Sequence, residues 1–132
     1  MKKKSKHFIT ACGTYPNQIL ISVGGTYKEM VDYLVKEKID ITDFQEFKEH
    51  IENFTGKGDK GFEMMNEKGQ ILLYLKEFKD NWETYEVLLH EVCHIVQDLF
   101  DQRGMVGEKE AFAYELEYLF RNIRKLLNHL NK

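Results

Sequence analysis

The sequence predicts an α+β domain, in which a small β-sheet with a hairpin packs on two long helices, the second of which is C-terminal. Three observations support this fold class. The chain has 132 residues, enough for one hydrophobic core and not for two. Apolar runs rich in strand-forming residues occur in its first two thirds. Apolar residues repeat at helical spacing through its last third, so we treat residues 1–132 as one domain.

The first predicted unit is a strand followed by a helix. Residues 18–23 form a β-branched run that ends at a Gly-Gly pair, which indicates a strand closed by a turn. Thr26 follows as the expected N-cap, and Glu29 completes a capping box. The next apolar residues keep helical spacing, so we expect a helix over about residues 27–38.

A weaker helix, a loop and a hairpin are predicted next. Residues 42–54 carry apolar side chains at helical spacing, and the glycines of 55–61 lack the spacing of a phosphate-binding loop. Residues 62–65 and 71–75 flank an Asn-Glu-Lys-Gly turn, a pattern typical of a β-hairpin. The second of these strands is either an ordinary core strand or the sheet edge that receives an extended peptide.

Two long helices are expected to complete the domain. The first covers about residues 82–100, and a polar, glycine-containing connector at 101–107 ends it. The second runs from about residue 108 to the end of the chain. The predicted core stripe of the first helix consists of Tyr85, Leu88, Leu89, Val92, Val96 and Leu99. That of the second consists of Phe112, Leu116, Leu119, Ile123, Leu126, Leu127 and Leu130.

Charge, hydropathy and cysteine content indicate which partners and which cellular location to expect. The net charge of -3 predicts no nucleic-acid binding, and the local basic run falls in residues 1–7, which we expect to be a flexible tail. No apolar run approaches the length of a membrane span or of a secretion signal, so we expect no membrane partner and a cytoplasmic location. Cys12 and Cys93 are too few for a disulfide framework.

The most informative motif is His-Glu-x-x-His at residues 90–94. On a helix, His90 and His94 project from the same face one turn apart, so both imidazoles can reach one Zn²⁺. Glu91 lies at the edge of that face, where it can accept a proton from water without binding the metal. Chance produces this pattern in about a third of a percent of chains of this length. The alternative is a pair of surface histidines on an ordinary helix.

A third zinc ligand is expected from the acidic start of the last helix. Glu108 and Glu110 both lie in its first turn, where a carboxylate also stabilises the helix dipole. The connector is long enough, at about 3.3 Å per residue, to fold back along the histidine face. We favour Glu110 because it lies deeper in the helix, and Glu108 remains the alternative.

These residues resemble a known family of enzymes. The runs at 90–94 and 110–114 are similar to those of the gluzincin branch of the zincin metallopeptidases, in which a glutamate on a second helix is the third zinc ligand. Residues 110–119 further resemble the end of small zincin-like proteins found in tailed phages and prophages. The resemblance implies a zincin-like fold, with Zn²⁺ held by His90, His94 and Glu110 and with Glu91 as the general base.

One position departs from the family pattern. Tyr114 stands where larger gluzincins place an aspartate or asparagine that supports a histidine ligand. The supporting residue is therefore open among Gln97, Asp98 and Asp101. Tyr114 itself either donates a hydrogen bond to a developing oxyanion or packs as an ordinary aromatic residue.

The sequence thus predicts a zinc-dependent metallopeptidase acting on a peptide or protein substrate. The alternative is a zincin-like module that binds another protein, with a structural or non-catalytic zinc. Glu91 discriminates between these classes, because a structural zinc site has no use for a general base.

Overall fold

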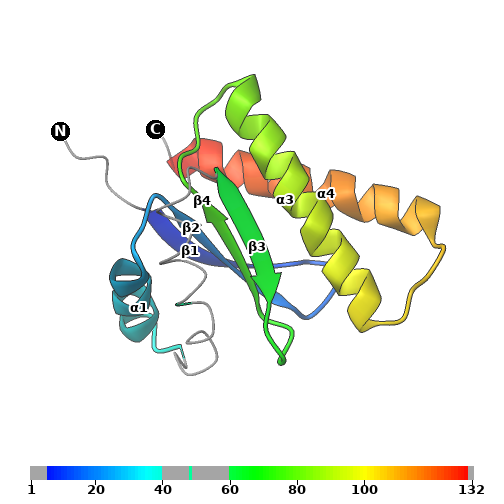
Figure 1. Cartoon of the computed structure of the whole chain (residues 1–132), viewed down its shortest axis with the longest axis horizontal. Helices are drawn as coiled ribbons and strands as arrows, with labels where there is room; N and C mark the ends of the chain where they lie inside the picture. Colours follow the sequence, from blue (N-terminus) through cyan, green and yellow to red (C-terminus); the bar gives the residue numbers. More distant parts are fainter. Residues whose placement is uncertain (1–5, 40–47, 49–59, 131–132) are drawn as a thin grey trace.

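The computed structural model describes residues 6–39, 48 and 60–130 and confirms the α+β class. A sheet lies between one short helix and a pair of long helices (Figure 1). The described elements, in chain order, are β1 (Lys6–Ala11), β2 (Gln18–Val23), α1 (Tyr27–Lys36), β3 (Gly61–Met65), β4 (Ile71–Leu75), α3 (Trp82–Gln102) and α4 (Lys109–Leu130).

The four strands pair in the order β1-β2-β4-β3. The central pair, β2 and β4, is parallel, and the two outer pairs are antiparallel. The predicted hairpin is confirmed, and Asn66 shapes its turn by accepting hydrogen bonds from the backbone N–H groups of Lys68 and Gln70 at 3.1 and 2.8 Å. β4 is buried along its whole length, so it is a core strand, and β1 and β3 are the two edges of the described sheet.

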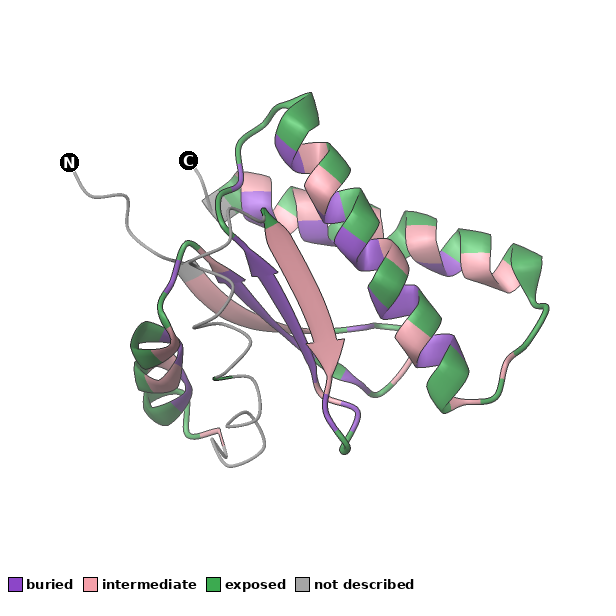
Figure 2. Cartoon of the chain, viewed as in Figure 1, coloured by how far each residue is buried: buried purple, intermediate pink, exposed green. Residues whose placement is uncertain are grey.

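Apolar side chains fill both faces of the sheet, because parallel central strands carry helices on each side. On one face, Met30 and Leu34 of α1 pack against Leu20 of β2 and Leu72 of β4. On the other face, β2 and β4 meet α3 and α4. In Figure 2 the inner strands and the facing stripes of the helices are buried. The residues of that larger cluster include Ile19, Ile21, Ile71, Leu73, Leu88, Val92, Ile95, Leu99, Leu119 and Ile123.

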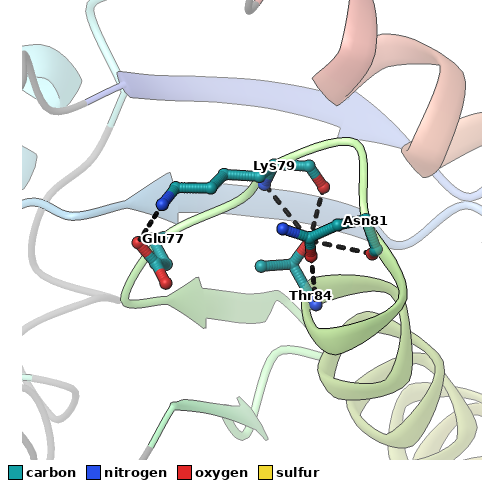
Figure 3. A network of polar contacts seen from close by, with 4 residues as sticks. All are labelled: Glu77, Lys79, Asn81 and Thr84. Atoms are coloured by element: carbon teal, nitrogen blue, oxygen red, sulfur yellow. Dashed lines mark hydrogen bonds and ion pairs between the residues drawn. The ribbon is translucent and has the colours of Figure 1, made fainter.

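A polar cap fixes the start of α3. Asn81 is the N-cap, and its Oδ1 accepts a hydrogen bond from the backbone N–H of Thr84 at 3.0 Å. The buried Thr84 hydroxyl donates to the carbonyl of Lys79, and Lys79 forms an exposed ion pair with Glu77 (Figure 3). These contacts anchor the first turn of α3 to the segment that leaves β4, and so set the rotation of the helix over the sheet.

A second polar group anchors the other end of α3. Arg103 donates hydrogen bonds to Asn17 Oδ1 at 2.7 Å and to the carbonyl of Leu99 at 3.0 Å. Its guanidinium lies 4.1 Å from the centre of the Tyr15 ring. Asn17 in turn donates to the carbonyl of Gly69 at 2.6 Å. The β1–β2 turn, the hairpin turn and the end of α3 are therefore tied together.

Several boundaries differ from the sequence prediction. β1 was not predicted, and it takes in Lys6 and His7, which we had placed in the tail. His7 Nδ1 lies 2.9 Å from the buried hydroxyl of Ser22, so the strand is held by a side-chain contact as well as by pairing. Leu89 was expected in the core and is 43% exposed. Apart from residue 48, the predicted helix at 42–54 lies outside the described residues, and so does most of the loop at 55–61.

Candidate metal centre

The two motif histidines converge on one point at the middle of α3. Their Nε2 atoms lie 3.2 Å apart, and the rings meet edge to face with centroids separated by 4.7 Å. Both residues are exposed, and the side chain of His90 is 68% accessible. The helical spacing has thus brought two ring nitrogens within hydrogen-bond distance of each other on a face open to solvent.

This separation fits a shared metal ion. Two nitrogens that bind one tetrahedral zinc, each at about 2.0–2.1 Å, lie about 3.3–3.4 Å apart. The observed 3.2 Å between the His90 and His94 Nε2 atoms is close to that value. The donor set is also appropriate, since neutral imidazole is a common zinc ligand.

Gln97 supports the second histidine. Its Oε1 lies 3.0 Å from His94 Nδ1, where the amide oxygen accepts the Nδ1 proton and leaves Nε2 unprotonated. Of the three candidates named above, Gln97 is the one whose side chain contacts His94. Asp98 bonds to a different residue, Glu63, and Asp101 lines a pocket beyond Gln97.

Glu91 is the buried member of the motif. It is only 7% exposed, and its Oε1 lies 4.0 Å from His90 Nε2. Burial raises the pKa of this carboxyl, while the positive charge that His90 and His94 can carry acts in the opposite direction. A carboxylate with a raised pKa, placed beside two metal-ligand candidates, is suited to accepting and returning a proton.

The sequence analysis missed a carboxyl pair on the same flank of α3. Glu63 on β3 is hydrogen-bonded to Asp98, and burial, this hydrogen bond and the charges of Asp98 and Glu91 raise the pKa of Glu63 to about 9. Glu63 therefore carries a proton at neutral pH. The sequence signal for Glu63 is the alternation of side chains along β3. Phe62 and Met64 pack on the α1 side of the sheet, so Glu63 between them faces α3.

Glu110 is exposed in the first turn of α4. Among the residues that the structure describes, no three His, Cys, Asp or Glu side chains are grouped as a ligand set. The alternative residue, Glu108, lines a pocket of about 400 Å³ that Gln97 also lines. This pocket opens between the end of α3 and the start of α4, one turn beyond His94.

Tyr114 lies away from the histidine face. It is 68% exposed and lines a separate pocket with Thr14 and Tyr15 of the β1–β2 turn. The structure therefore brings together His90, Glu91, His94 and Gln97, and leaves Tyr114 apart from them.

None of the described helices combines the length and the apolar content needed to cross a membrane. No family model, no curated protein and no solved structure matches the chain.

Proposed function

We propose that the chain is a zinc-dependent metallopeptidase of the zincin type, acting on a peptide bond. The observation that carries this proposal is the 3.2 Å separation of the His90 and His94 Nε2 atoms, with the buried Glu91 beside them. Helical spacing alone places two imidazoles on one face, but an ordinary pair of surface histidines has no need of a buried carboxylate beside it.

His90 and His94 would hold the zinc ion, and Glu110 or Glu108 at the start of α4 would complete the set. Bound zinc polarises a carbonyl and lowers the pKa of a water molecule. Glu91 accepts the proton of the attacking water and passes it to the leaving amine. Gln97 keeps His94 in the tautomer whose Nε2 is free to bind.

An edge of the described sheet is consistent with the proposed peptide substrate. Of the two edge strands in the described sheet, β3 is the one that packs on α3, beside the carboxyl groups of Glu63, Asp98 and Glu91. Backbone groups on the outer side of an edge strand can pair with an extended peptide. In this proposal the peptide therefore binds along β3. One of the sequence interpretations had placed it along β4.

Metal content tests the first half of the proposal. Protein purified without added zinc is expected to hold one zinc per chain, and His94→Ala is expected to lose it. His129→Ala is the matched control, because His129 is exposed near the end of α4 and belongs to no motif. Glu110→Gln and Glu108→Gln then identify the third ligand. Metal-free wild-type protein would refute the site.

Hydrolysis of a mixed peptide library tests the second half. Glu91→Gln is expected to keep its zinc and to lose cleavage, whereas Glu86→Gln, an exposed residue of the same helix, is expected to keep both. If Glu91→Gln retains every activity of the wild-type protein, the chain is a zincin-like binding module and not a peptidase.

A further inference from the structure

His7 of the edge strand β1 lies on the α1 face of the sheet. Among the described strands β1 pairs with β2 alone, and His7 stands opposite Ser22 in that pairing. Its Nδ1 lies 2.9 Å from the hydroxyl of Ser22, which is buried. The ring also lies so close to the turn after β2 that a Cβ at Gly25 would overlap it. The imidazole is therefore fixed between β2 and the turn that follows it.

A row of side chains continues this site across the sheet and onto α1. Ser22 pairs in turn with Tyr74 of β4, so the three residues lie in register on one face. The hydroxyl of Tyr74 donates to a carbonyl of the same turn at 2.9 Å. From α1, the ring centre of Tyr33 lies 5.9 Å from that of His7, and its hydroxyl is hydrogen-bonded to the backbone of Ile9. His7 is thus part of the contact that holds β1 to both β2 and α1.

Nε2, the second ring nitrogen of His7, is buried and makes no hydrogen bond with any residue that the structure describes. A neutral imidazole carries one N–H group, whereas the protonated ring carries two. The hydroxyl of Ser22 can pair with Nδ1 in either state, because it both donates and accepts. Protonated His7 would therefore bury a positive charge and an Nε2–H group without an acceptor, which is unfavourable.

Burial is the main influence on the pKa of His7, which it lowers from the ordinary value of 6.5. The negative charge of Glu29, which caps α1, acts in the opposite direction and is the smaller effect. Tyr33 of α1 and Tyr74 of β4 are the other titratable groups beside the site. Burial raises the pKa of both tyrosines, so they stay neutral in the acidic range. The closed site therefore favours neutral His7.

β1 is suited to opening separately from the rest of the sheet. It has a neighbour on one side, and residues 7–11 are partly buried or exposed, whereas β4 is buried along its whole length. Elements with few buried contacts open at a lower free energy than the whole fold. In the open form His7 faces water and regains its ordinary pKa, so the open form binds a proton more readily than the closed one.

We propose that His7 is an acid-sensitive latch on β1. Neutral His7 holds the strand between β2 and α1, and protonated His7 favours the open strand, which uncovers the backbone edge of β2. The contribution of neutral His7 to closure is complete above pH 6.5 and is lost progressively as the pH falls below that value. For one proton, the equilibrium constant for opening rises by at most about ten-fold per pH unit.

Amide hydrogen exchange between about pH 5 and pH 7.5 tests the latch, with a metal chelator present and with rates corrected for intrinsic exchange at each pH. The amides of β1 are expected to be less protected than those of β4 at every pH. Wild-type protection in β1 is expected to fall below pH 6.5, by up to about ten-fold per pH unit. His7→Gln, which cannot be protonated in this range, is expected to lose this dependence. His129→Gln, which removes an exposed histidine from α4, is expected to keep it.

Three results would overturn the proposal. Equal protection of β1 and β4 would mean that the strand opens only when the whole fold does. The same pH dependence of β1 in wild type and His7→Gln would assign it to another group. If His7→Gln does not fold, the NMR titration of the His7 ring protons in wild type decides the question, and a midpoint at or above pH 6.5 counts against the latch. His94→Ala is expected to keep the wild-type pH dependence, so a failed zinc proposal leaves this result standing.

Discussion

Replacing Glu63 by glutamine is expected to change how the stability of the protein depends on pH. Glu63 is buried against Asp98 and near Glu91, and its pKa rises from 4.5 to about 9 in the folded protein. The substitution Glu63→Gln keeps the size of the side chain. The new amide would still donate a hydrogen bond to Asp98, as the protonated Glu63 carboxyl does.

The number of protons bound to Glu63 in the folded and unfolded states decides whether stability rises or falls with pH. Between pH 4.5 and about 9 the folded protein keeps the Glu63 proton and the unfolded chain releases it. The contribution of Glu63 to stability is therefore complete below pH 4.5 and is lost as the pH rises toward 9. For a single proton the free energy of unfolding falls by at most about 1.4 kcal/mol per pH unit.

Urea denaturation of both proteins between pH 5.5 and 8.5, with a metal chelator present, measures this contribution. The free energy of unfolding is expected to decline more steeply with pH in wild type than in Glu63→Gln, with the difference growing by up to about 1.4 kcal/mol per unit. Glu67→Gln, at an exposed position of the hairpin turn, is the control and is expected to keep the wild-type slope. Parallel curves for wild type and Glu63→Gln would show that Glu63 is ionised in the folded protein and would refute this account.

The other contacts of α3 lead to three further predictions. Gln97→Ala is expected to weaken zinc binding about 10- to 100-fold in a chelator competition, because the hydrogen bond to the Nδ1 of a ligand is lost; unchanged affinity would exclude that role. Arg103→Ala is expected to lower the free energy of unfolding by about 1–3 kcal/mol, since it leaves Asn17 Oδ1 without this donor, and Arg103→Lys is expected to restore only part of it. Leu99→Ala is expected to cost about 2–5 kcal/mol in urea denaturation and Leu89→Ala far less, because Leu99 is fully buried and Leu89 is 43% exposed. Equal costs at the two positions would mean that α3 is rotated differently on the sheet.

The elements that the sequence predicted well are those specified by local contacts. Thr26 and Glu29 form the expected capping box, with both hydrogen bonds between side chain and backbone present. Asn66 closes the hairpin within its own turn. Each of these contacts joins residues two to four positions apart, so the sequence pattern and the structure report the same interaction.

The convergence of His90 and His94 was likewise determined by the sequence alone, because a helix places residues four apart on one face whatever surrounds it. Only the tertiary structure decided which side chains support that pair. Gln97 and Asp98 are neighbours on one helix, and the rotation of α3 on the sheet turns Asp98 toward Glu63 and leaves Gln97 beside His94.

Tertiary contacts also decided the position of β4 in the sheet. The apolar run of Ile71–Leu75 suits an edge strand that binds a peptide or a central strand, and it is central because β2 pairs with it in parallel. That pairing joins residues some fifty positions apart, which no local pattern specifies. Local hydrogen bonds and helical periodicity thus determined the elements and the motif, and long-range packing decided which faces are buried and which groups meet.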